Sequence, residues 1–350
     1  MTIISSEYKN WIGELKQRIR QSQIKAAVKV NTELLRLYWE LGSDIVERQK
    51  NAQWGDGFLK QLSQDLSAEF PEMTGFSVRN LQQICKWYNF YNQRFIIAKQ
   101  VVSQLQENFF STPWGHHILI MQRCKDIDKA LFYIQQTVNN NWSRTVLDWQ
   151  IDSNLYERQG KAISNFSKTL PSPQSDLAQQ ITKDPYIIDI MGIRQEMEER
   201  ELEAHLDKNI SQYLLELGKG FTYYGHQVHL RIGDEDFYID QLFYHVRLHC
   251  YVVVELKAVK FKPEHIGQLN FYVAAVDNLM RTQGDNPTIG ILICKDKNDV
   301  VVEYTLQNVE NPIGVSSLQI YDKLTADYKS SLPTIEEIEA QLRDKDIGNF

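Results

Sequence analysis

Two acidic residues and a lysine lie in neighbouring segments whose composition is typical of β-strands. Asp240 lies within residues 236–246, and Glu255 and Lys257 close residues 250–257. An acid, followed by an acid-x-lysine at the end of the next strand, is the minimal set of side chains for hydrolysing a phosphodiester with a divalent metal. The spacing of these three side chains therefore predicts a metal-dependent nuclease.

Strand geometry predicts how these groups meet. Side chains alternate between the two faces of a strand, so Glu255 and Lys257 share one face about 6–7 Å apart. Val254 and Leu256 then face the core. If the strand that holds Asp240 pairs beside this one, both carboxylates reach one cation, and the carbonyl of Leu256 supplies a third oxygen. Such a set suits Mg²⁺ or Mn²⁺, which keeps several waters, and Lys257 would orient the attacking water and stabilise negative charge.

Other positions could supply the first acid. Asp234 and Asp236 are alternatives, but they belong to a Gly-Asp-Glu-Asp turn, where solvated carboxylates are expected. A lone Glu-x-Lys on a strand is also common on solvated sheet faces. Here the preceding residues 252–254 are all valine, which favours a buried strand whose charges need a partner or an ion. Asp240 is therefore the preferred first acid.

Composition and charge are those of a globular protein with two dissimilar halves. The 350 residues carry a net charge of −7, and the length suggests two domains. Residues 1–170 contain 21 Lys and Arg against 16 Asp and Glu, whereas residues 171–350 contain 17 against 29. The mildly basic first half is the expected docking surface for nucleic acid, because a metal-binding cleft must itself be rich in carboxylates.

The location predicted from the sequence is the cytoplasm. The four cysteines are scattered, with no zinc-like spacing, and are expected to be buried small hydrophobic residues in a reducing compartment. The first residues lack the pattern of a secretion signal, and no run approaches the ~18–20 apolar residues of a membrane span.

Helical periodicity dominates the first half of the chain. Residues 8–48 and 58–70 show apolar spacing of three and four, and Ser77 is placed to cap a helix over residues 78–91. The order of helix, turn and helix over residues 58–91 is that of a DNA-reading helix-turn-helix. The outer face of the second helix would contact phosphates and base edges through five polar side chains, which are Arg79, Asn80, Gln82, Gln83 and Lys86. A solvated helix face is the alternative.

Two further features have plain structural interpretations. His116 and His117 are adjacent, so they point in different directions, and no carboxylate partner is evident; a structural use is favoured over a metal site. Aromatic residues over 87–91 could stack on bases, but most are expected in a helical core.

The predicted domain boundary is loop-like and rich in proline. We expect a helical domain over residues 1–165, a linker over 166–190 and a catalytic domain over 191–350. In the last of these, a charged helix over residues 196–219 precedes three strands at 221–230, 236–246 and 250–257. A helix over 263–281 and a strand over 288–294 follow, with a further strand at 316–321 and a terminal helix beginning at Thr334.

This pattern resembles the PD-(D/E)xK nuclease superfamily, whose core is an αβββαβ unit. Asp240 matches the first acid, although Ile239 replaces the usual proline, and Glu255 and Lys257 match the ExK element. The resemblance also implies that Gln268 is the glutamine of the resolvase-like branch. It further implies that Glu216 is an extra metal or water contact, although an exposed carboxylate at a helix end is the alternative.

The first half is similar to the N-terminal domain of YhcG-type proteins, which join a helical, winged-helix-like module to such a nuclease domain. The similarity rests on Leu62-Ser63-x-Asp65-Leu66 with Phe70-Pro71, on Gly75-Phe76-Ser77 with Asn80-Leu81, and on Trp114-Gly115-His116-His117. The resemblance implies an α+β two-domain bacterial endonuclease connected with mobile elements or defence. Its expected activity is hydrolysis of DNA with Mg²⁺ or Mn²⁺.

Three matters stay open at the level of sequence. One alternative is a DNA-binding or assembly module whose nuclease-like domain is idle, and a weaker one is cleavage of RNA. A double-strand cut requires two active sites, for which a symmetric homodimer is the simplest arrangement. The sequence identifies neither the interface nor a partner protein.

Overall fold

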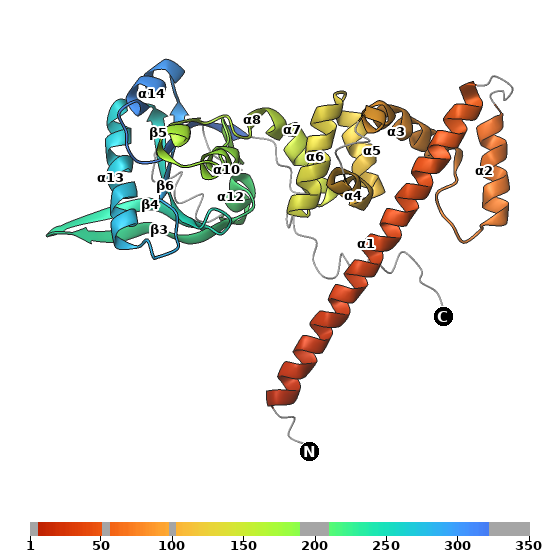
Figure 1. The fold of residues 1–350 in the computed structure, drawn as a ribbon, viewed down its shortest axis with the longest axis horizontal. Coiled ribbons are helices and arrows are strands. Elements are labelled where there is room, and N and C mark those ends of the chain that lie inside the picture. The colour runs from red at the N-terminus through yellow and green to blue at the C-terminus, as the bar shows by residue number, and fades with distance from the viewer. Residues whose placement is uncertain (1–5, 51–56, 98–102, 190–209, 322–350) are drawn as a thin grey trace. The chain divides into compact units, whose positions relative to one another are not determined.

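Residues 6–50, 57–97, 103–189 and 210–321 are described in the computed structural model of the chain (Figure 1). The chain divides between Ile151 and Asp152 into two units. The described part of the first unit contains α-helices alone. They are α1 (Ser6–Lys50), α2 (Phe58–Glu69), α3 (Val78–Ile97), α4 (Ser103–Ser111), α5 (Trp114–Arg123), α6 (Ile127–Asn140) and α7 (Arg144–Asp152).

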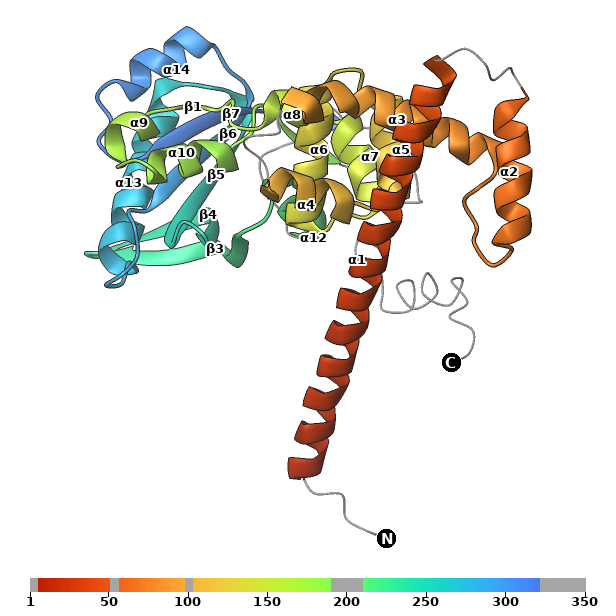
Figure 2. The same cartoon turned by 45° about the vertical axis from the view of Figure 1, so that its right-hand side comes forward.

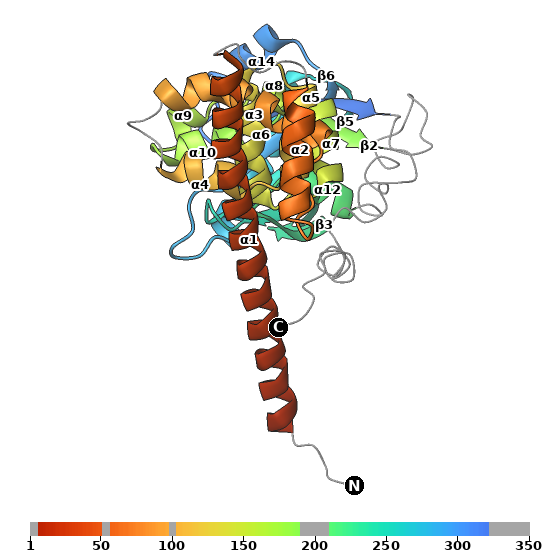
Figure 3. The same ribbon diagram turned by 90° about the vertical axis from the view of Figure 1, so that its right-hand side faces the viewer.

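An aromatic core holds the helices of the first unit together. On α3, Leu81, Ile84, Trp87 and Tyr91 are buried at intervals of three and four residues. The ring of Trp87 stacks on that of Phe109 with centroids 5.1 Å apart. Figure 3 shows α1 extending well beyond the other helices of its unit, with α2 beside its C-terminal part.

The second unit is a mixed α and β structure. Its helices are α8 (Leu155–Arg158), α9 (Phe166–Thr169), α10 (Gln174–Ile181), α12 (Ile210–Leu217), α13 (Pro263–Leu279) and α14 (Asp299–Leu306). Its strands are β1 (Ile163–Ser164), β2 (Tyr186–Asp189), β3 (Phe221–Ile232), β4 (Glu235–His245), β5 (Cys250–Lys260), β6 (Ile289–Asp296) and β7 (Ile313–Tyr321).

One sheet organises this unit. The strand order is β1-β7-β6-β5-β4-β3, and β2 pairs with β7 off this path. The strands β3, β4 and β5 form an antiparallel meander, whereas β5, β6 and β7 are parallel. The helix α13 connects β5 to β6, which is the crossover that a parallel pair requires. The predicted αβββαβ order is therefore confirmed, and α14, between β6 and β7, is an addition that the sequence did not predict.

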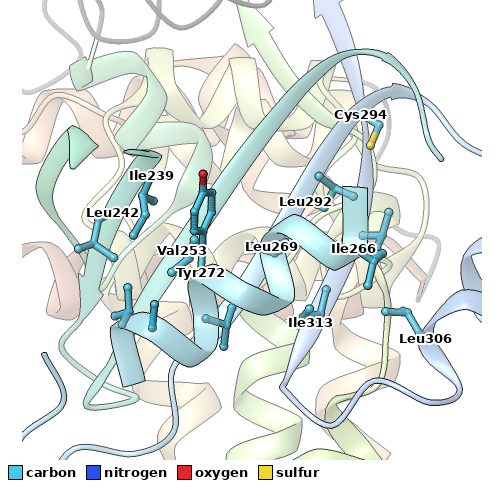
Figure 4. Close-up of a cluster of buried hydrophobic side chains, with 14 of the residues drawn as sticks. Ile239, Leu242, Val253, Ile266, Leu269, Tyr272, Leu292, Cys294, Leu306 and Ile313 are labelled. Atoms are coloured by element: carbon cyan, nitrogen blue, oxygen red, sulfur yellow. The ribbon is translucent and has the colours of Figure 1, made fainter. Parts of the chain in front are cut away.

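Both faces of the sheet are covered by helices (Figure 2). One core joins residues of α9, α10 and α12 to Val252, Val254 and Leu256 of β5. The other joins α13 and α14 to residues of the sheet such as Val253, and Figure 4 shows its side chains around Leu269 and Tyr272. Because residues 252–254 of β5 are buried, facing one core or the other, this part of its sequence is a continuous apolar run rather than an alternating one.

The segment expected to be a linker contributes to this core. Phe166, Leu170, Ala178 and Tyr186 are all buried in the first of the two clusters. The prolines that suggested a loop instead separate short elements: Pro171 and Pro173 lie between α9 and α10, and Pro185 precedes β2. The structural boundary at residue 151 thus precedes the predicted one.

Some expectations concern other parts of the chain. The four cysteines are buried and free, as predicted. Within the described residues, no helix is both long and apolar enough to cross a membrane. The predicted helix over residues 196–219 is described only as α12, and the predicted helix beginning at Thr334 lies outside the described residues.

Candidate active site

The candidate site lies where two strands of the sheet separate. The ladder between β4 and β5 runs from His245 opposite Cys250 to Gln241 opposite Val254 and ends there. The next residues in this register are Asp240 and Glu255. On its other side, β5 remains paired with β6 in unbroken register as far as Lys257. We call the point where β4 leaves β5 the fork.

The carboxylate of Asp240 occupies the fork. The N–H of Leu256 donates to Asp240 Oδ2 at 3.2 Å, and the N–H of Asp240 faces Glu255 Oε1 at 3.4 Å. Side-chain oxygens thus take the place of the backbone acceptors that a continued ladder would supply. Asp240 and Glu255 are 8% and 1% exposed, so two carboxylates are held together out of bulk water.

Lys257 completes the group predicted from the sequence. Its Nζ lies 3.6 Å from Glu255 Oε2 and 4.0 Å from Asp240 Oδ2. The alternation of β5 explains this arrangement, because Val254 and Leu256 pack into the core on the opposite face. The structure therefore brings Asp240, Glu255 and Lys257 together.

The alternative acids lie elsewhere. Asp234 is exposed in the turn between β3 and β4, and Asp236 lies with its Oδ1 2.6 Å from Nε2 of His229. Among the described contacts, neither joins Glu255 or Lys257. The preference for Asp240 over these two residues agrees with the geometry.

The electrostatics of the fork favour a bound cation. Burial, and then the negative charge of Asp240, raise the pKa of Glu255 well above its usual value, and Lys257 only partly opposes this. Glu255 Oε2 is buried and meets no hydrogen-bond donor among the residues that the structure describes. An unsatisfied carboxylate oxygen beside a second carboxylate is costly unless a proton or a cation meets it.

The ligand set fits a hard divalent cation better than zinc. In the described residues, no three His, Cys, Asp or Glu side chains are close enough to share a metal, so protein side chains would supply only Asp240 and Glu255. The N–H of Leu256 points to Asp240, and the carbonyl of a strand residue points to the same neighbour as its N–H. The Leu256 carbonyl is thus directed toward Asp240. The oxygens of Asp240, Glu255 and this carbonyl, completed by water, form a ligand set that suits Mg²⁺ or Mn²⁺.

Gln268 has a different environment from the one that the resemblance implied. It is exposed on α13, and its Nε2 donates to the hydroxyl of Tyr272 at 3.4 Å. No contact among the described residues joins it to Asp240 or Glu255. The glutamine is on the expected helix, but it is not part of the observed group.

Glu216 belongs to a separate buried ion-pair cluster. Its Oε1 accepts from Arg158 Nη1 at 2.6 Å and from the N–H of Ile187 at 2.8 Å, and its Oε2 lies 3.9 Å from Lys183 Nζ. Burial lowers the pKa of Lys183 to about 8, an effect that the charge of Glu216 opposes. Glu216 is 1% exposed, so the alternative of a solvated helix-end carboxylate is wrong. Its described bonds fix α12 and β2 rather than reaching the fork.

Two residues near Asp240 were not predicted. Gln227 of β3 lies opposite Asp240 in the register, and its Nε2 donates to Asp240 Oδ1 at 3.4 Å from a backbone with φ of 46°. Tyr213 of α12 is buried, and burial followed by the charges of Tyr186, Glu216 and Asp240 raises its pKa. Only the strand register reveals Gln227, and no sequence signal distinguishes Tyr213 from a core tyrosine.

Part of the polar outer face predicted for the candidate DNA-binding helix, α3, is exposed. Ser77 caps α3 by accepting from the N–H of Asn80 at 3.3 Å, as expected. Arg79, Gln82 and Lys86 are exposed, and Gln83 is half-buried.

Asn80 is the exception on this helix. Its Nδ2 donates to the carbonyl of Gly75 at 2.7 Å, and its Oδ1 accepts from Trp114 Nε1 at 2.8 Å. Both ends of its amide are therefore used in holding the turn, and the prediction that Asn80 reads bases is corrected.

The adjacent histidines are structural, as expected. His117 is buried, accepts from Trp87 Nε1 at 3.1 Å through Nδ1, and donates through Nε2 to the carbonyl of Phe109 at 2.9 Å. Burial lowers its pKa to about 3 despite the second bond. His116 Nε2 lies 3.0 Å from the carbonyl of Trp142, on a different part of the unit.

Comparison with known proteins follows the division of the fold. Residues 14–158 match the family model of the DUF1016 N-terminal domain, and residues 179–333 match that of the YhcG PDDEXK nuclease domain. The curated protein "Putative nuclease YhcG" of Escherichia coli (strain K12) is 28% identical over 342 residues, which cover 89% of this chain and 88% of that protein.

One solved structure is a more distant match. It is the crystal structure of a repair endonuclease from Pyrococcus abyssi, with 16% identity, 37% of this chain and 50% of that chain covered, and a TM-score of 0.26. This chain spans about half the length of that structure. The two family models and the full-length relative agree with the fold, and this chain combines a DUF1016 N-terminal domain with a C-terminal YhcG PDDEXK nuclease domain.

Proposed function

We propose that the protein is a Mg²⁺- or Mn²⁺-dependent DNA endonuclease whose catalytic group is Asp240, Glu255 and Lys257. The observation that carries the proposal is the fork, where two buried carboxylates and a lysine converge within 4.0 Å and one carboxylate oxygen has no donor in the described part of the chain. The YhcG PDDEXK nuclease domain supports hydrolysis of nucleic acid as the reaction class.

Each residue has a distinct part in the proposed reaction. Asp240, Glu255 and the Leu256 carbonyl would hold the metal, which would polarise the scissile phosphate and lower the pKa of a water. Lys257, fixed between the two carboxylates, would orient the attacking water and stabilise the charge that develops on the phosphate. Gln227 orients Asp240 through its 3.4 Å bond.

Cleavage assays on the full chain test this proposal. Supercoiled plasmid, linear DNA and RNA of one sequence are incubated with Mg²⁺, Mn²⁺ or a chelator. We expect metal-dependent DNA cleavage that is lost in Asp240→Asn, Glu255→Gln and Lys257→Met. Asp234→Asn and Lys260→Met are matched controls, because these residues are exposed and lie outside the fork, and they should cleave as the wild type does.

The outcomes separate the remaining alternatives. Cleavage that persists in all three site variants would reject the assigned group. Cleavage of RNA alone would change the substrate class. DNA binding without cleavage or metal affinity would identify a binding module whose nuclease-like domain is idle.

We further propose that the helical unit positions DNA through α3. The exposed Arg79 and Lys86 support this, because cations on one helix face neutralise phosphates and release counterions. Replacing both with alanine should reduce the slope of log affinity against log salt by about 2, at ~0.9 per phosphate contact. Arg123→Ala is the control, since Arg123 is already paired with Asp148 at 3.0 Å. An unchanged slope in the double variant would remove α3 from the DNA interface.

A further inference from the structure

Most described side chains in the first half of α1 are exposed. Leu35 is the first buried residue among them, and those before it are exposed or half-buried. Figure 3 shows this part of the helix extending away from the other helices of its unit. At 1.5 Å per residue, residues 8–30 make about 35 Å of such helix. Because helices in proteins gain most of their stability from packing an apolar face, an exposed helix of this length calls for a partner.

An apolar line runs along this exposed half. Ile19 and Val30 are 51% and 65% exposed, and with Ile12 and Leu37 they recur at intervals of seven and eleven residues, which are about two and three helical turns. Leu37 lies about 200° round the helix from the buried Leu35, so this line is not the side that packs in the helical unit. We call the line the stripe; it consists of Ile12, Leu15, Ile19, Val30 and Leu37.

The stripe is a surface that favours a partner. Single exposed apolar residues are common on protein surfaces, but a continuous line of them marks an interaction site. The stripe therefore predicts that a second apolar face lies along α1.

Basic residues lie on both sides of the stripe. Residues 8–30 contain six Lys and Arg against one acid. Lys16 and Arg20 lie on one side of the stripe, Arg18 and Lys29 lie on the other, and all four are exposed. Two copies of α1 laid along each other would bring these like charges together, which disfavours a second α1 as the partner. Phosphates would meet the charges but would leave the stripe in water. An acidic amphipathic helix satisfies both features.

The C-terminal end of the chain carries such a sequence, outside the described residues. Residues 334–347 contain five Asp and Glu against two Lys and Arg. They begin with the capping-box pattern Thr334-Ile335-Glu336-Glu337. Ile335, Ile338 and Leu342 have the spacing of an apolar helix face, and a helix over this range would be about 21 Å long, which is shorter than the stripe.

We propose that residues 334–347 form an amphipathic helix that lies along the stripe of α1 in the same chain. The two apolar faces cover each other, and the carboxylates of the C-terminal helix meet the basic residues of α1. Docking within one chain is intramolecular, so it needs fewer contacts than the recruitment of a second molecule from solution. The inference is independent of the proposed nuclease activity.

Hydrogen–deuterium exchange of the full chain, read by mass spectrometry, tests the proposal in both directions. Amides of residues 8–30 should exchange slowly in the wild type. Ile338→Asp combined with Leu342→Asp should speed their exchange at least tenfold, the change expected when one or two aliphatic side chains lose their burial. Ile19→Asp should speed the exchange of residues 334–347 to a similar degree.

Each substitution has a matched control. Val28→Asp places the same charge on α1 at an exposed position nine residues from Ile19, which is half a turn round the helix and off the stripe. Leu324→Asp places it in the C-terminal part of the chain, before the amphipathic pattern begins. Neither control should change the exchange of the other segment. Thermal unfolding confirms that each variant is folded.

Three results would overturn the docking. The first is fast exchange of residues 8–30 in the wild type, or slow exchange that Ile338→Asp with Leu342→Asp leaves unchanged. The second is slow exchange that depends on protein concentration, which would assign the stripe to a second copy of the chain. The third is slow exchange that appears only when DNA is added in the presence of a chelator, which would assign this part of α1 to nucleic acid.

Discussion

Replacing Glu255 with glutamine should stabilise the metal-free protein while abolishing its function. Burial and the charge of Asp240 raise the pKa of Glu255 well above its usual 4.5. The folded state therefore holds this proton more tightly than the unfolded chain does. The stability that this proton contributes is fully present below pH 4.5 and is lost as the pH rises toward the folded pKa. Glutamine has no such proton to lose, and its oxygen can still accept from the N–H of Asp240.

The size of the effect follows from linkage. In the pH range where the unfolded chain has lost this proton and the folded chain still holds it, the free energy of unfolding falls by ~1.36 kcal/mol per pH unit. Between the usual value of 4.5 and pH 7, the cost is at most about 3 kcal/mol. The ion pair with Lys257 reduces this amount, because it favours the charged form. We therefore expect the Glu255→Gln protein to exceed the wild type by about 1–3 kcal/mol at pH 7, with the difference shrinking toward pH 4.5.

Urea unfolding in the presence of a chelator, at pH 5, 6 and 7, measures this difference. Glu264→Gln is the control, because Glu264 is an exposed residue on α13 and should show no such trend. Adding Mn²⁺ should reverse the order, since only the wild type gains stability by binding the metal. A Glu255→Gln protein that is less stable at every pH, or whose advantage does not vary with pH, would refute the electrostatic description of the fork.

Three further predictions concern the fork and the separate ion-pair cluster of Glu216. Gln227→Ala removes the 3.4 Å bond to Asp240 and should weaken Mn²⁺ binding by about 0.5–1.5 kcal/mol in calorimetry, whereas unchanged affinity would exclude a positioning role. Arg158→Met leaves Glu216 charged and buried and should destabilise the protein by about 3–5 kcal/mol in urea unfolding; a much smaller loss would show that Lys183 suffices as its partner. Apparent Mn²⁺ affinity should rise with pH because Glu255 must lose its proton to bind, and a flat profile between pH 5 and 8 would contradict the raised pKa.

The meander and the proximity of Asp240, Glu255 and Lys257 could be predicted because they are local. Strand alternation places Glu255 and Lys257 on one face, and the short turn to the preceding strand places Asp240 beside them. A helix of regular apolar spacing, α13, then follows in sequence. These features depend on neighbours within about 20 residues, where periodicity carries most of the information.

The remaining features depend on partners that are distant in sequence. Glu216 is neutralised by Arg158, 58 residues earlier, and Asn80 is engaged by Trp114, 34 residues later. No periodicity encodes such pairs, so both residues were assigned to functional surfaces instead. The segment 166–190 was interpreted as a linker because its prolines mark turns, yet residues such as Phe166 between the breaks are buried in the core. Gln227 depends on the register between β3 and β4, which is fixed only in the folded sheet.

The most direct test of the catalytic fork is calorimetric titration of Mn²⁺ into the full chain. Asp240→Asn keeps the size of the side chain and one acceptor oxygen for the N–H of Leu256, but it removes one negative charge beside Glu255, and Asp234→Asn makes the same change in the exposed turn. We predict one Mn²⁺ site in the wild type and in the Asp234→Asn protein, and none in the Asp240→Asn protein. Equal Mn²⁺ binding by the wild type and the Asp240→Asn protein would contradict the assignment of the metal to the fork.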